Sequence, residues 1–119
     1  MLPIKIAPDI HWVGLNDRIT PIFEGTWPIQ PAGVSYNAYL IKDEKNALID
    51  PGPALASGEI IARINSILPV TELDYIVVNH IEPDHAGAIG AMLQAAPKAV
   101  LVGNAKTFDM LKNYVPLGE

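Results

Sequence analysis

The sequence contains no cysteine, no long apolar run and no excess of basic residues, and each absence excludes a class of protein. Without cysteine the chain can form neither disulfides nor thiolate metal sites, which fits a reducing cytosol. No apolar run approaches the about 20 residues that a transmembrane helix needs, so we expect no membrane contact. Lysine and arginine number 8 against 13 acidic residues, giving a net charge of −5. With no basic stripe, we expect no nucleic-acid partner.

Signal segments, internal repeats and low-complexity linkers are absent as well. Residues 1–5 lack a charged stretch followed by an apolar signal core, which predicts a cytoplasmic protein. The length of 119 residues predicts a single domain with a core of modest stability. Half of the residues are hydrophobic and the mean hydropathy is +0.23, which is high for a short water-soluble chain. We therefore expect apolar surface to be buried against protein.

Short apolar runs separated by Pro, Gly and polar turns predict a set of strands. Turns are expected at 16–18 and 43–46, and a long loop at 25–33. Trp27 in that loop either anchors the loop on its own domain or shapes a substrate pocket or a contact with a partner. In the strand at 36–42, Tyr36, Ala38 and Leu40 share one face. The remaining strands are expected at 4–7, 10–14, 19–23, 47–50, 75–79 and 99–102.

Three helices are predicted between and after the later strands. The first is capped by Ser57 and ends before Pro69, with one face formed by Ile60, Ile61, Ile64, Ile67 and Leu68. The second, at 86–96, has small residues that allow close packing on the sheet, and the third is capped by Asn104. This order predicts an α/β fold with one mixed sheet and helices on one face.

The segment 77–87 is the most informative part of the chain. A β-branched apolar run predicts a buried strand, and directly after it come two imidazoles and two carboxylates within six residues. Such groups, crowded at the end of a buried strand, must be paired, hydrated or metal-bound. The candidate metal ligands are His80, Glu82, Asp84 and His85.

These side chains form a ligand set that suits iron, manganese or zinc. Residues two apart in extended backbone face the same way, so His80 and Glu82 can bind one ion. Pro83 fixes φ and turns the chain, so Asp84 and His85 can face a second ion nearby. His11 lies elsewhere in the pattern and is expected to be a structural or exposed histidine rather than a ligand.

The spacing His80-x-Glu82-x-Asp84-His85 resembles the metal motif of the flavodiiron proteins, a branch of the metallo-β-lactamase fold. Segments 23–29, 34–41 and 47–50 are similar to that family in content and order. The resemblance implies that residues 1–119 form a single partial domain, half of a metallo-β-lactamase-like αββα sandwich without a flavodoxin-like domain. Hydrolases of the fold usually carry His in place of Glu82, and a carboxylate favours iron there.

The resemblance implies the metal-binding part of an oxidoreductase that reduces dioxygen or nitric oxide at a dinuclear non-haem iron site. Electrons would come from FMN on another domain or chain. The family takes further ligands from a second half that this chain does not match, and the bare sheet face would expose an apolar patch. We expect association with a like chain around a two-fold axis or with a separate chain; otherwise the sequence is a piece of a longer protein.

Other interpretations remain open. A zinc hydrolase of the same fold would use a metal-bound hydroxide, with Asp84 orienting the water, but Glu82 counts against it. A non-catalytic assembly module would bind metal weakly or not at all. Asp50 closes the strand beside the metal motif in the family and is either a hydrogen-bond partner of the ligands or a turn residue before Pro51.

Overall fold

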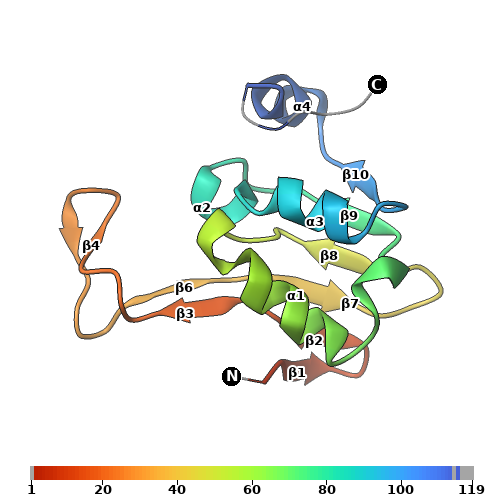
Figure 1. Ribbon diagram of the computed structural model, residues 1–119, viewed down its shortest axis with the longest axis horizontal. Helices are drawn as coiled ribbons and strands as arrows, with labels where there is room; N and C mark the ends of the chain where they lie inside the picture. Colours follow the sequence, from red (N-terminus) through yellow and green to blue (C-terminus); the bar gives the residue numbers. More distant parts are fainter. Residues whose placement is uncertain (1, 114, 116–119) are drawn as a thin grey trace.

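The computed structural model describes residues 2–113 and 115, and its centre is a six-stranded mixed sheet (Figure 1). Four neighbouring strands are antiparallel, and the last two continue the sheet in parallel. In spatial order the strands are β1 (Ile4–Ala7), β2 (Ile10–Trp12), β7 (Tyr39–Ile41), β8 (Ala47–Ile49), β9 (Tyr75–Val77) and β10 (Val100–Val102).

Two short antiparallel pairs leave the main sheet and form an arm (Figure 1). They are β3 (Leu15–Asp17) with β6 (Val34–Tyr36), and β4 (Ile22–Phe23) with β5 (Trp27–Pro28). The predicted turn at 16–18 is therefore wrong, because these residues belong largely to β3. The predicted strand at 36–42 is divided between β6 and β7, which belong to different sheets. Trp27 is 64% exposed in the arm.

The helices are α1 (Ser57–Asn65), α2 (Pro83–Ala86), α3 (Ile89–Ala95) and α4 (Ala105–Leu111), with 3₁₀ turns at Ala54–Ala56 and Val70–Glu72. The predicted cap at Asn104 is confirmed, since its Oδ1 accepts the Thr107 N–H at 2.9 Å. The predicted cap at Ser57 is wrong, because the 3₁₀ turn leads directly into α1 and Ser57 has helical backbone. None of the described helices is long and apolar enough to cross a membrane.

The predicted helix at 86–96 begins earlier and is interrupted. Pro83 takes the first position of α2, where its missing N–H costs nothing. The helix stops at Gly87, and α3 starts again at Ile89. As a result Asp84 and His85 lie within a helical turn that begins before the predicted helix at 86–96.

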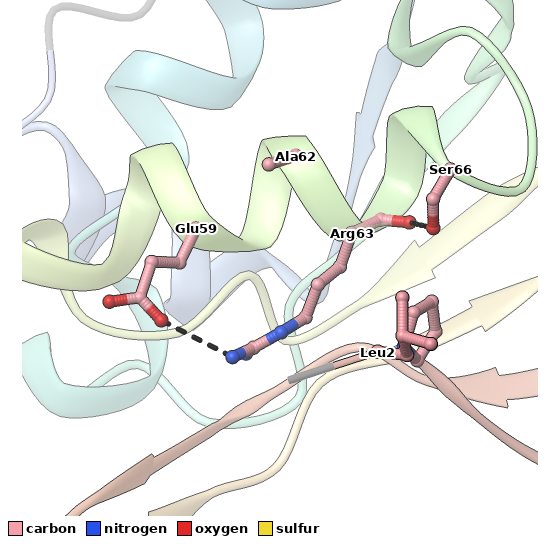
Figure 2. Close-up of a pocket in the computed structure, with 6 residues that line it drawn as sticks. Leu2, Glu59, Ala62, Arg63 and Ser66 are labelled. Atoms are coloured by element: carbon pink, nitrogen blue, oxygen red, sulfur yellow. Dashed lines mark hydrogen bonds and ion pairs between the residues drawn. The ribbon is translucent and has the colours of Figure 1, made fainter.

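A buried arginine ties α1 to the N-terminal strands (Figure 2). The Arg63 guanidinium donates to the Gly14 carbonyl, pairs with Glu59 at 3.2 Å and lies 5.9 Å from the centre of the Trp12 ring. The contacts satisfy the charge that burial would otherwise leave unsolvated. Beside it is a hollow of about 410 Å³ lined by Leu2, Pro3, Glu59, Ala62, Arg63 and Ser66.

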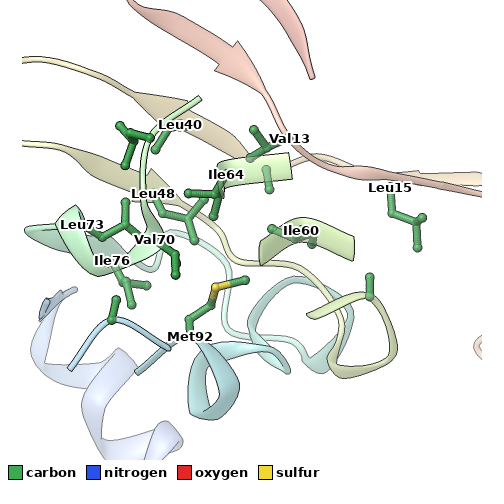
Figure 3. Close-up of a cluster of buried hydrophobic side chains, with 14 of the residues drawn as sticks. Val13, Leu15, Leu40, Leu48, Ile60, Ile64, Val70, Leu73, Ile76 and Met92 are labelled. Carbon is green, nitrogen blue, oxygen red and sulfur yellow. The ribbon is translucent and has the colours of Figure 1, made fainter. Parts of the chain in front are cut away.

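The core lies between the sheet and the helices (Figure 3). Leu40, Leu48 and Ile76 stand side by side on neighbouring strands and are fully buried. Onto them pack Ile60 and Ile64 of α1 and Met92 of α3. Each such side chain contributes about 1.5–3 kcal/mol by leaving water, so this layer holds the helices on the sheet. The predicted apolar face of α1 is confirmed at Ile60 and Ile64.

The opposite face of the sheet is also apolar, and the described helices lie on the other side (Figure 1). Strand register places its residues in two rows, many of them partly or largely exposed. The predicted half-sandwich is confirmed. We call this surface the open face; its rows are Ile4, Trp12, Tyr39, Ile49, Val77 and Val102, and Ile10, Ile41, Ala47, Tyr75 and Val100.

A buried carboxylate closes the turn between β3 and β4 in the arm. Asp17 accepts the Thr20 hydroxyl at 2.5 Å, the Thr20 N–H at 3.0 Å and the Ile19 N–H at 2.9 Å. These bonds, the Thr20 hydroxyl first, hold the pKa of Asp17 below its usual range. Asp17 therefore stabilises the fold in its ionised form.

Replacing Asp17 with Asn should lower the free energy of unfolding by about 1–2 kcal/mol near neutral pH. A pKa lowered by folding contributes stability above its unfolded value of about 3.9 and loses it as pH falls through the folded value. The difference between wild type and variant should thus shrink in acid. Urea unfolding at neutral pH and at about pH 3 measures it. The exposed Asp9→Asn variant should match wild type, and a difference unchanged in acid would contradict the assignment.

Candidate metal centre

The candidate ligands lie on the metal loop, which we define as residues 78–85; it follows β9 and includes the first three residues of α2. Because β8 and β9 run parallel, their carboxyl ends meet at the same edge of the sheet. This brings the segment after β8, residues 50–53, against the metal loop. Crevices outside the carboxyl ends of strands are where open α/β sheets bind ligands.

The structure brings three of the four candidate ligands into one group. His80, Asp84 and His85 each offer a ligand atom, and these atoms lie within 4.8 Å of one another. His85 Nε2 is 3.0 Å from Asp84 Oδ2, and the two imidazole rings are 4.7 Å apart, edge to face. Glu82 stands beside this group, with Oε2 3.6 Å from His80 Nε2.

The spacing of these atoms fits metal binding. Two donors about 2.1 Å from one ion and about 90° apart are about 3.0 Å from each other, which is the separation of the Asp84 and His85 atoms. Imidazole nitrogen with carboxylate oxygen suits iron, manganese or zinc. His80 and Glu82 are 51% and 58% exposed, whereas Asp84 and His85 are 21% and 29% exposed. The second pair is thus the more sheltered part of the site.

Asp50 holds the backbone of the metal loop. Its Oδ1 accepts the Asn79 N–H at 2.8 Å and the His80 N–H at 3.2 Å, while its own N–H donates to the Val77 carbonyl at 2.9 Å. Asp50 has φ +51°, a left-handed conformation that is uncommon outside glycine. Its carboxylate therefore acts on the peptide groups that carry His80, not on the imidazole ring.

Gly52 holds the other end of the loop. Its N–H donates to the His85 carbonyl at 2.9 Å, and its carbonyl accepts the Ala88 N–H at 2.9 Å. Gly52 has φ +85°, and a Cβ there would lie 2.7 Å from Cδ1 of Ile60. The left-handed φ favours glycine, and a Cβ would in addition displace the end of the Ile60 side chain. Asp50 and Gly52 together fix the metal loop at its start and at α2.

Residues from the arm complete the surroundings, and the sequence did not single them out as site residues. Phe23, Glu24 and Tyr36 line a hollow of about 600 Å³ together with Glu82 and Asp84. Burial, followed by the charges of Asp17, Asp84 and Glu24, raises the pKa of the Tyr36 phenol. The strand alternation placed Tyr36 on one face with Ala38 and Leu40, and all three are buried. It could not show that β6 leaves the sheet and brings Tyr36 to the metal loop.

His11 lies on β2, between Lys5 and Leu40 in the sheet register. It is not part of the ligand group found among the described residues. Its Nδ1 is buried without a hydrogen-bond partner in the part of the chain that the structure describes. Its place in the sheet agrees with the expectation of a structural histidine.

Comparison with known proteins now identifies the family. The family model described as "ODP family beta lactamase" matches residues 34–117, most of the chain and the whole metal loop. The chain belongs to this family. The match covers β6 to α4, so the strands, helices and metal loop that build the candidate centre are those of the family domain.

The relatives of this ODP-family chain are longer proteins. It is 41% identical to a nitric oxide reductase from Moorella thermoacetica over 92% of its own length and 28% of that protein. Among structures, it resembles the flavodiiron protein of Giardia intestinalis (TM-score 0.87, 31% identity, 96% of this chain and 27% of that one). The rubredoxin oxygen:oxidoreductase of Desulfovibrio gigas is also similar (TM-score 0.87, 34% identity, 94% and 28%).

The chain spans about a quarter of the length of these relatives. Over that quarter the ODP-family fold follows the flavodiiron structures closely, which confirms the resemblance drawn from the sequence. The metallo-β-lactamase-like character of the half-sandwich is likewise confirmed.

Replacing Asp50 with Gly should loosen the metal loop without straining the backbone, because glycine accepts φ +51°. The Asn79 and His80 amides would lose their acceptor, so their hydrogen exchange should accelerate at least about tenfold. Metal affinity should fall by about 10–100-fold. NMR-detected exchange and a Co²⁺ titration measure the two effects. The matched control is Asp43→Gly in the β7–β8 turn. Equal amide protection in Asp50→Gly and wild type would contradict the role of Asp50 as the acceptor for the Asn79 and His80 amides.

Proposed function

We propose that this chain is the metal-binding part of a flavodiiron-type oxidoreductase that reduces dioxygen or nitric oxide at a dinuclear non-haem iron site. The observation that carries the proposal is the grouping of His80, Asp84 and His85 at the carboxyl end of β9, with Glu82 beside them. Relatives named nitric oxide reductase and rubredoxin oxygen:oxidoreductase support this class of reaction.

The chemistry of the donors supports iron as the metal. His80, Glu82, Asp84 and His85 offer two neutral imidazoles and two carboxylates, and the carboxylates compensate the charge of an oxidised ion. Iron would supply the electron transfer to the bound gas. The residues of this chain hold the ion and exclude part of the solvent, and none of them need act as an acid or base. Glu82 in place of a histidine counts against a zinc hydrolase.

Two parts of the reaction come from outside the described residues. A dinuclear site needs more ligands than these four side chains provide, and a flavin such as FMN would deliver the electrons. The open face offers the corresponding surface, because a bare apolar sheet of this size is covered in most proteins. We propose that a second half of the sandwich, in another part of a longer protein or in another chain, covers the open face and completes the site.

Replacing Glu82 with His should move the metal preference from iron toward zinc, since imidazole is the softer donor. Wild type and variant would be exposed to equal amounts of Fe²⁺ and Zn²⁺ without oxygen, and the bound metals measured by mass spectrometry. We expect the bound iron-to-zinc ratio to fall at least about tenfold. The control Glu72→His changes an exposed residue outside the metal loop and should keep the wild-type ratio. An unchanged ratio in Glu82→His would contradict a direct ligand role.

Placing a charge on the open face should prevent its association. We expect the purified chain to sediment above its 12.8 kDa mass and Val100→Lys to shift it toward that mass, because Val100 is 56% exposed in the open face. Met110→Lys on α4 is the matched control and should leave the mass unchanged. Sedimentation velocity over a range of concentrations is the measurement. A wild-type chain that is monomeric throughout would contradict self-association.

A further inference from the structure

A line of aromatic rings connects the arm to the metal loop. The Phe23 and Tyr36 rings are 6.4 Å apart, and the Tyr36 and His85 rings are 6.5 Å apart and nearly perpendicular. His85 in turn meets the His80 ring edge to face at 4.7 Å. Residues distant in sequence are thus in contact through β6, which places Tyr36 between Phe23 and His85.

Tyr36 is itself firmly held, as a side chain that positions another must be. It is 5% exposed and belongs to the main core. Its backbone pairs with Leu15 across β3 and β6. At Gly14 a Cβ would lie 2.1 Å from the Tyr36 carbonyl oxygen, so the two backbones are in close contact that only glycine permits.

The described contacts of the His85 ring with Asp84, His80 and Tyr36 differ in what a metal would do to them. Asp84 Oδ2 lies 3.0 Å from His85 Nε2, so a metal bound by both atoms would replace that contact. His80 is itself a candidate ligand. The contact with Tyr36 is edge to face between the two rings, so it needs neither ring nitrogen of His85 as a donor or acceptor.

We propose that Tyr36 is a positioning residue of the metal centre, whose ring fixes the imidazole of His85 in the orientation that faces Asp84 and His80. The backbone of His85 is already fixed by the bond from Gly52, so the ring rotation is the freedom that remains. Tyr36 removes it both before and after a metal binds. The role of Tyr36 in metal binding rests on the proposed function, whereas its contact with the His85 ring does not.

Tyr36→Met tests the inference, because methionine fills the space with a flexible chain and no ring. Tyr36→Phe keeps the ring and removes only the hydroxyl. Tyr75→Met on the open face is the matched control. Long-range ¹H–¹⁵N NMR of the imidazoles, recorded on the metal-free chain at about pH 8 for every variant, reports each ring separately. His11 serves as an internal reference for folding.

We expect the His85 signals of Tyr36→Met to broaden or move toward those of free histidine, while His11 stays unchanged. Tyr36→Phe and Tyr75→Met should keep the wild-type His85 signals. If Tyr36→Met also disturbs His11, Phe23→Leu loosens the Tyr36 ring from its other side and takes its place. Wild-type His85 signals in a folded Tyr36→Met or Phe23→Leu chain would overturn the inference.

A Co²⁺ titration then separates the two proposals. We expect Tyr36→Met to weaken Co²⁺ binding by about tenfold and Tyr36→Phe to leave it unchanged. In a His85→Ala background Tyr36→Met should add nothing, because the two residues act as one unit. An effect that persists in that background would overturn positioning through His85. A wild-type chain that binds no Co²⁺ would count against the proposed function alone, since the metal-free spectra still decide the role of Tyr36.

Discussion

The metal loop depends on one charge-assisted interaction, the acceptance of two peptide N–H groups by the Asp50 carboxylate. A chain that leaves a buried strand and turns into a short helix loses its ladder partners, and its N–H groups must find others. A carboxylate is a strong acceptor. Because β8 and β9 are parallel, β8 ends at the same edge of the sheet as β9 and places Asp50 beside the metal loop. The left-handed backbone of Asp50, which costs about 1 kcal/mol or more, persists because these bonds fix it.

Two glycines extend the backbone contacts of the metal loop into the helices. Gly52 joins the loop after β8 to His85 and Ala88. A Cβ at Gly87 would lie 2.5 Å from the Pro83 carbonyl oxygen and 2.9 Å from the Ala54 N. The metal loop, α2 and the 3₁₀ turn before α1 are therefore packed at backbone distance. The positions of Asp84 and His85 therefore depend on the core packing that holds α1 and α3 on the sheet.

The sequence predicted much of what short-range chemistry determines, although not the start of α1 at Ser57, and it missed the strand pairing that long-range packing determines. Spacing within a few residues gives the apolar face of α1, the Asn104 cap and the shared face of Tyr36, Ala38 and Leu40. It does not give the departure of β6 from the sheet. Alternation gives the faces of a strand but not its partner, and β6 pairs with β3, more than fifteen residues earlier. The ligand-type residues could be named from sequence, whereas the contact between Tyr36 and His85 required that pairing.

Burial divides the four candidate ligands into two unequal pairs. Asp84 and His85 are sheltered by the backbone contacts of the metal loop and by Tyr36, while His80 and Glu82 are more than half exposed. Ligands in water gain less from a metal, because their orientation must be fixed when it binds. Under the proposed function, this chain therefore organises one side of the site in advance. The exposed pair lies where further protein would have to supply both the missing ligands and the exclusion of water. The open face sets the same requirement, since its apolar rows are buried only when a second layer covers them.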